Sequence, residues 1–179
     1  MAMVSVVMTS RADKSVPVAA SARVQAVLEQ VLDPEIPVIS VVELGIIRHV
    51  RVDDTGRAHV GVSPTYSGCP ATEFIKTNIR QALDEAGFTN ALITDELSPP
   101  WTSDWITESG RAKLRAYGIA PPAEAVASPR ALTRPQLAIA CPQCNSLQTA
   151  KISEFGSTPC KALYRCTSCL EPFDYFKCL

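Results

Sequence analysis

Two Cys-x-x-Cys pairs near the C-terminal end of the chain are the clearest indication of a chemical function, the binding of a metal ion. The first pair is Cys141 and Cys144, the second is Cys166 and Cys169, and 21 residues separate them. Each pair lets two thiolates reach one ion from a tight turn, and two pairs from adjacent hairpins complete a tetrahedron. Because so short a segment cannot fold around its own core, bound metal has to supply the missing stability. The spacing predicts a structural zinc site.

Other uses of these cysteines stay open. Two disulfides, a redox-active pair, or a rubredoxin-like iron centre would use the same residues. Zinc is the preferred interpretation, and four thiolates leave no open position for a substrate. Two further cysteines, Cys160 and Cys178, are interpreted as small buried hydrophobic residues. The alternative is that they form a second site for a soft metal, or a labile thiol pair.

Cys69 is the one cysteine outside this region, and it lies between Gly68 and Pro70 at the start of a predicted helix. Free backbone N–H groups at a helix start stabilise an anion, which favours the thiolate. Gly68 allows another molecule to approach the backbone closely. Such a thiolate serves as a nucleophile, or as a ligand for a soft metal or a cluster. A plain buried thiol is the alternative.

The elements that position Cys69 follow from periodicity. A first helix is predicted to start at Ser21 and to stop at Asp33-Pro34, because proline disfavours helical geometry in the residue before it. A stiff loop, residues 33–37, follows. Alternating and β-branched residues then predict a hairpin. The predicted hairpin strands are 46–52 and 57–62, followed by a helix over 70–86, a strand over 91–97 and a helix over 109–117.

The chain therefore divides into two modules of an α/β (α+β) protein. The first is a three-stranded sheet with helices, and the second is an all-β zinc ribbon. Prolines and alanines mark the boundary as a semi-rigid linker, and the N-terminal segment lacks any period, which predicts disorder. The expected divisions are a tail over 1–20, the first module over 21–118, the linker over 119–136 and the ribbon over 137–179.

Charge and hydropathy exclude several classes of protein. The 17 basic and 18 acidic residues give a net charge of −1, whereas nucleic-acid binders carry a basic excess. No stretch approaches the ~20 apolar residues of a membrane span, and the N-terminus does not read as a signal peptide. Reduced or metal-bound thiols in the cytoplasm are therefore expected.

An enzymatic role would require a base beside Cys69. His49 and His59 are the only histidines, and both lie on the predicted hairpin. A Cys–His dyad with either is an alternative. No pair of acidic residues has acid/base spacing and no glycine-rich phosphate loop is present, so no catalytic residue is assigned.

Two parts of the sequence resemble known families. The segment 33–36, the hairpin, and residues 65–70 followed by a helix resemble the SufT-like metal–sulfur cluster assembly family, over about residues 21–120. Residues 99–107 fit the end of that family. Residues 155–166 and 171–178 are more specific. Joined to the first module, they resemble the PaaD (or PaaJ) family, whose members are accessory components of phenylacetyl-CoA epoxidase systems.

The resemblance implies an accessory role in aerobic phenylacetate breakdown. A PaaD-type protein would help to insert iron, or a transient iron–sulfur cluster, into the epoxidase components. Cys69 would be the working residue, with Asp33, Glu35 and Thr65 shaping its site. Implied partners are the epoxidase components, especially the iron–sulfur reductase, and the iron–sulfur assembly machinery; a homodimer that shares one cluster is a further possibility. No predicted helix carries the Glu-x-x-His of a di-iron protein.

The alternative is a non-catalytic docking component of the epoxidase complex. The ribbon and the segment that carries Trp101 and Trp105 would then be the docking surfaces. Buried aromatic anchors dominate many protein interfaces, although aromatic residues after a Pro-Pro pair more often pack locally.

Overall fold

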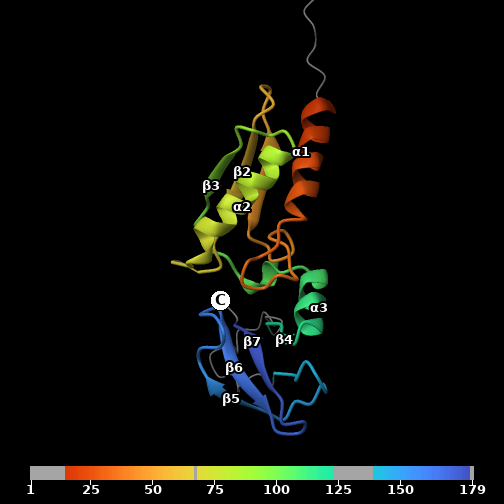
Figure 1. Ribbon diagram of the computed structural model, residues 1–179, viewed down its shortest axis with the longest axis vertical. Coiled ribbons are helices and arrows are strands. Elements are labelled where there is room, and N and C mark those ends of the chain that lie inside the picture. The colour runs from red at the N-terminus through yellow and green to blue at the C-terminus, as the bar shows by residue number, and fades with distance from the viewer. Residues whose placement is uncertain (1–14, 67, 123–138, 178–179) are drawn as a thin grey trace, which may run out of the picture.

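The computed structural model describes residues 15–66, 68–122 and 139–177, and it has two modules along its long axis (Figure 1). Cys178, most of the predicted tail and most of the predicted linker lie outside these residues. No described helix combines the length and the apolar character needed to cross a membrane.

The first module is built on a three-stranded sheet of order β1-β2-β3. Strands β1 (Ile47–Val52) and β2 (Ala58–Val62) pair antiparallel, which confirms the predicted hairpin. Strand β3 (Leu92–Asp95) pairs parallel to β2. A parallel neighbour requires a crossover connection, and helix α2 (Ala71–Glu85) provides it.

Helix α2 packs on this sheet through a stripe of apolar residues spaced four apart. Ala71, Ile75, Ile79 and Leu83 are all buried, whereas the rest of the helix is mainly polar. Helical spacing places such residues on one face. Figure 1 shows α2 crossing in front of the sheet with α1 beside it. The start of α2, and with it Cys69, is thereby fixed relative to the sheet.

Helix α1 (Ser15–Leu28) begins earlier than predicted. Ser21 is not its N-cap: the Ser21 hydroxyl accepts a hydrogen bond from the N–H of Val52 at 3.2 Å. Ala19 and Ala20 are good helix formers that continue the helix toward the N-terminus. The prediction of disorder throughout residues 1–20 is therefore wrong from residue 15 onward.

Two short helices complete the first module. The one-turn helix η1 (Ser103–Trp105) follows the Pro-Pro pair, and α3 (Glu108–Ala116) agrees with the predicted helix over 109–117. The hydroxyl of Thr107 caps α3 by accepting a hydrogen bond from the N–H of Gly110 at 3.1 Å.

The second module is a four-stranded sheet of order β4-β7-β6-β5. Strands β5 (Thr149–Ser153), β6 (Lys161–Cys166) and β7 (Pro172–Phe176) form an antiparallel meander. Strand β4 (Ile119–Ala120) pairs parallel to β7. The sequence predicts residues 119 and 120 to be linker. That prediction is wrong, because both residues are buried and pair with the ribbon.

The two modules share a hydrophobic core where β7 ends. Phe176 is only 1% exposed and belongs to the core of the first module. Its ring centroid lies 6.1 Å from that of Trp101, whose indole N–H donates to the carbonyl of Leu44 at 3.1 Å. Cys160 joins the same core. The ribbon is therefore packed onto the first module rather than tethered to it.

The variant Phe176→Ala tests this shared core. Removing a buried phenyl ring should lower the free energy of unfolding by about 3–5 kcal/mol, which is measurable by urea denaturation. Phe155 lies on the ribbon and is 66% exposed, so Phe155→Ala is a matched control that should change stability by less than about 1 kcal/mol. Equal losses in the two variants would contradict the shared core.

Candidate functional site

Cys69 lies in the tight turn that leads into helix α2. Its N–H donates to the carbonyl of Tyr66 at 3.2 Å, and its carbonyl accepts from the N–H of Thr72, also at 3.2 Å. Pro70 is the N-cap and offers no side-chain cap, so the helix begins at Ala71, one residue later than predicted. Cys69 therefore stands next to a helix start that has no side-chain cap and at which its own carbonyl accepts the N–H of Thr72.

Gly68 has a positive φ of 92°. A side chain at this position would enter open space but would require a strained backbone. The glycine therefore sets the turn that orients Cys69, and it leaves the solvent side of the turn uncrowded.

The loop between α1 and β1 presents two carboxyl groups to the same region. The Oδ1 atom of Asp33 accepts hydrogen bonds from the N–H groups of Glu35 and Ile36, at 2.9 and 2.8 Å. Helix α1 ends at Leu28, earlier than the predicted stop at Asp33-Pro34, and this Asx turn makes the loop after it rigid. Asp33 is itself buried. The loop that carries Asp33 and Glu35 is thus a fixed wall.

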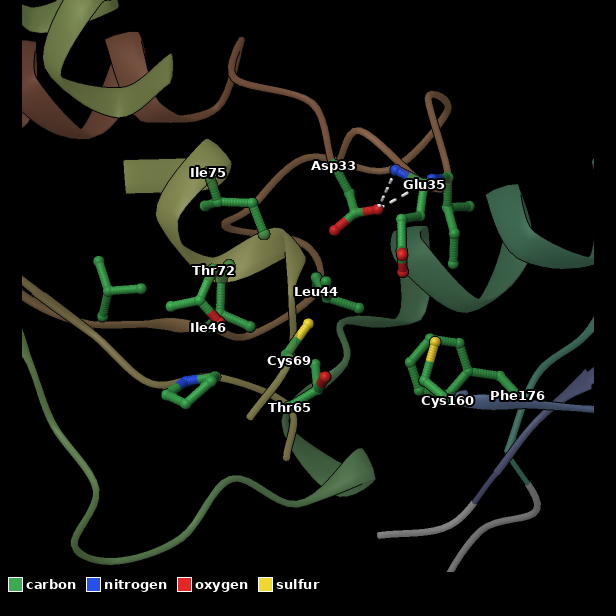
Figure 2. Close-up of a pocket in the computed structure, with 13 residues that line it drawn as sticks. Asp33, Glu35, Leu44, Ile46, Thr65, Cys69, Thr72, Ile75, Cys160 and Phe176 are labelled. Carbon is green, nitrogen blue, oxygen red and sulfur yellow. Dashed lines mark hydrogen bonds between the residues drawn. The ribbon is translucent and has the colours of Figure 1, made fainter. Parts of the chain in front are cut away.

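A cavity of about 20 Å³ brings these groups together. Figure 2 shows Cys69 and Thr65 on one side, with Asp33 and Glu35 above. Apolar residues of the first module, among them Leu44 and Ile75, line the cavity too, and Cys160 and Phe176 are the contribution of the ribbon module. The predicted residues Cys69, Asp33, Glu35 and Thr65 therefore meet around one cavity, and Cys160 joins them there.

Burial governs the electrostatics of the two carboxyl groups. It raises the pKa of Asp33, and the N–H donors of Glu35 and Ile36 oppose the shift in part. It also raises the pKa of Glu35, and the charge of Asp33 adds to the increase. The ammonium group of Lys161, a residue only 3% exposed, opposes both pKa shifts. The cavity thus holds more acidic than basic groups.

Tyr66 and Cys160 respond to the same surroundings. Burial raises the pKa of the Tyr66 phenol, and so do the charge of Cys69 and a hydrogen bond with it. Burial also raises the pKa of the Cys160 thiol, although a hydrogen bond with Thr158 at 3.0 Å opposes the shift. The sequence does not predict either residue at this site, because only long-range packing brings Cys160 to Cys69 and no spacing marks Tyr66.

The histidines and tryptophans are engaged elsewhere. His49 pairs with Glu96 at 2.5 Å and His59 with Asp53 at 2.9 Å, and neither histidine lines the cavity. Trp101 is buried, so within the segment named by the docking alternative this side chain packs inside the protein. Trp105 is partly buried, with the guanidinium of Arg48 3.5 Å from the centre of its ring.

The four ribbon cysteines form a second, separate site. Their sulfur atoms all lie within 4.8 Å of one another. The sulfur atoms of Cys141 and Cys169 are 3.7 Å apart, and those of Cys144 and Cys166 are 3.6 Å apart. A tetrahedral ion with metal–sulfur bonds of about 2.3 Å separates its ligands by ~3.8 Å. The group therefore fits one four-coordinate metal ion.

Backbone geometry presents each of these cysteine pairs in a similar way. The residue after each pair has a left-handed conformation, Asn145 with φ 60° and Leu170 with φ 68°. The sulfur of Cys166 accepts N–H groups of Ser168 and Cys169 at 3.4 and 3.5 Å. These contacts lower the pKa of Cys166 to about 6, and the hydrogen bond from the N–H of Cys169 is the largest cause. Asparagine tolerates left-handed geometry whereas leucine rarely adopts it, so the second turn is held under strain.

Comparison with known proteins assigns the two modules separately. The family profile "PaaD zinc beta ribbon domain" matches residues 125–177, and the profile "Iron-sulfur cluster assembly protein" matches residues 21–87. An Escherichia coli K12 protein, provisionally named as the D component of 1,2-phenylacetyl-CoA epoxidase, is 51% identical over 154 residues. These cover 86% of this chain and 90% of that protein.

Other relatives match the first module. The "Fe-S protein maturation auxiliary factor YitW" of Bacillus subtilis is 32% identical over 92 residues, which are 51% of this chain and 89% of that protein. The crystal structure of a domain of unknown function, DUF59, from Bacillus anthracis superposes with a TM-score of 0.54 at 23% identity. The match covers 57% of this chain and 97% of that chain, and it supports the fold alone.

Removing one ribbon ligand tests the four-cysteine site. Cys144→Ser should reduce bound metal from about one ion per chain to well below half and should unfold the ribbon, because metal binding and folding are coupled. Metal content by mass spectrometry and circular dichroism measure the two effects. Cys69→Ser is the matched control and should retain the ion; full retention by Cys144→Ser would contradict the site.

The raised pKa of Asp33 predicts a pH-dependent stability. The folded state binds this proton more tightly than the unfolded state, so the stabilisation is complete below about pH 3.9 and is lost as the pH rises through the folded-state pKa. Asp33→Asn keeps the Oδ1 acceptor and cannot ionise. It should therefore be more stable than wild type at pH 7, by a margin that shrinks as the pH falls toward 4.

Urea denaturation at several pH values measures this margin. Asp53→Asn is a control whose stability should depend on pH in the opposite direction. Hydrogen bonds, first from Thr55 and second from His59, lower the pKa of Asp53. An Asp33→Asn variant that is less stable than wild type at every pH would contradict the prediction.

Proposed function

The chain belongs to the PaaD family of phenylacetyl-CoA epoxidase components, and on that premise we propose that it assists the assembly of iron or iron–sulfur centres in the other components of the epoxidase. The observation that supports this most is the position of Cys69. It is a thiol at a helix start, beside two carboxyl groups, in the module matched by the iron–sulfur assembly profile.

The cavity has the chemistry that such a role needs. A thiolate binds iron, both as a single ion and within an iron–sulfur cluster, and neighbouring carboxylates favour the binding of a cation. Cys69 is partly exposed, so a second protein can reach its sulfur. Thr65 lines the cavity beside Cys69, and Asp33 and Glu35 are held by the Asx turn. In this proposal Cys69 holds the metal until a client protein takes it.

The ribbon metal has a different role in the proposal. Zinc is the metal that best suits four thiolates at these separations, since it prefers tetrahedral sulfur ligation and has no redox chemistry. All four positions are filled by protein, so this ion is structural. It stabilises the module that completes the cavity wall with Cys160 and Phe176.

A docking role within the epoxidase complex is the second candidate. The ribbon carries several large apolar side chains that are more than half exposed, which is typical of a contact surface. They are Leu147, Ile152, Phe155 and Leu170. A docking component would co-elute with the rest of the epoxidase at micromolar concentration. Variants of Cys69 would not change that behaviour.

The iron and acid-labile sulfide content of the epoxidase reductase tests the first proposal. The reductase would be co-expressed with the wild-type protein, with Cys69→Ser, or with neither. If Cys69 is the working residue, the variant should give the same low occupancy as the absence of the protein. Equal occupancy in all three would exclude this role for the reductase and would favour the docking function.

A further inference from the structure

We propose that Cys160 is a second metal ligand beside Cys69, so that the ribbon supplies one of the two thiolates of a site for a single soft divalent metal ion. This inference rests on the proposed function for the use of that ion, but not for its binding. Cys160 belongs to the ribbon and Cys69 to the assembly module, so neither module contains the site alone.

The placement of the two thiols carries the first step. Both line the same cavity, and Cys160 is only 7% exposed while Cys69 is partly exposed. Figure 2 shows the Cys160 thiol in front of the Phe176 ring, with the carboxyl group of Glu35 above it and Cys69 opposite. A hydrogen bond with Thr158 at 3.0 Å restrains the Cys160 sulfur. The partly exposed thiol of Cys69 and the buried thiol of Cys160 therefore face the same cavity.

The charged groups around Cys160 are unusual for a cysteine whose only role is apolar packing. Asp33 and Glu35 both act on its thiol electrostatically, and both are carboxyl groups. Lys161 is the nearby cation, but its ammonium group also pairs with Asp174 at 3.8 Å. Two carboxyl groups and two thiols thus surround a cavity with one shared positive charge. A bound divalent cation would compensate this excess.

The size of the cavity selects what would bind. About 20 Å³ holds one water-sized group, which fits a single ion and not a preassembled cluster. Two thiolates with a carboxylate prefer metals such as iron(II), cobalt(II) and zinc(II) over magnesium or calcium. Binding would release the two thiol protons to solvent, because thiolates are the ligands.

The site differs from the ribbon site in how far it is preformed. Within the described part of the chain, the ribbon cysteines are the only group of three or more ligands within 4.8 Å of one another. The ligands of the cavity must therefore move together when the ion binds. Such a site holds an ion less tightly than the ribbon does, which suits a metal that has to be passed on.

Cobalt(II) is a suitable probe, because its charge-transfer absorption reports thiolate ligands. The full-length protein would first be loaded with one equivalent of zinc, which fills the tighter ribbon site and leaves the cavity free, then titrated with cobalt(II) under reducing, anaerobic conditions. Wild type should bind one cobalt ion beyond the zinc. Cys69→Ser and Cys160→Ser should each lose about half of the charge-transfer intensity and at least about tenfold in affinity, and the double variant should lose the band entirely.

Cys160→Ala accompanies Cys160→Ser, because one variant keeps the apolar character and the other the polarity of the site. Retained zinc and an unchanged unfolding midpoint would show that either variant is folded. Wild-type cobalt binding in a folded Cys160 variant would overturn the proposal, as would a wild-type protein without a thiolate–cobalt band.

The two proposals fail in distinguishable ways. Normal cobalt binding by Cys160→Ser, together with loss of reductase iron in Cys69→Ser, would leave the assembly function intact and remove the second ligand. A two-thiolate cobalt site with no effect on reductase iron would keep the site and remove the assembly function.

Discussion

The packing of Phe176 against Trp101 is the contact on which both modules depend. The ribbon buries only a small cluster of its own: the four cysteines hold one end of its sheet, and Phe176 and Cys160 at the other end are covered by the core of the first module. Strand β4 adds backbone hydrogen bonds across the same boundary. Because Phe176 and Cys160 reach the first module only through this packing, the cavity at Cys69 exists as a consequence of it.

The cavity also holds two carboxyl groups whose burial costs stability, which a purely apolar core would avoid. Asp33 and Glu35 are held where burial disfavours their ionised forms, and the N–H donors of the Asx turn compensate in part. Folded proteins commonly accept such a loss of stability at functional sites. Both carboxyl groups lie on one rigid loop, so this loss of stability is confined to that loop.

The parts of this structure that sequence predicts are local. The hairpin, the stripe of α2 and the paired cysteines follow from periods and spacings within a few residues, and the structure has all three. The position of Cys160 beside Cys69 depends on how two modules pack, and no local pattern encodes it. Strand β4 was missed for the same reason: Ile119 and Ala120 form a strand only because β7 lies beside them.

Strand β6 places Cys160 immediately before its first residue and Cys166 at its last. Six extended residues span about 20 Å, and a paired strand is stiff along its length. One stiff strand therefore joins the four-cysteine site at one end to the cavity at the other. If both sites bind metal as proposed, a newly synthesised chain would have to fill the four-cysteine site before strand β6 is in place. The connectivity of this one strand would then set the order in which the two sites are filled.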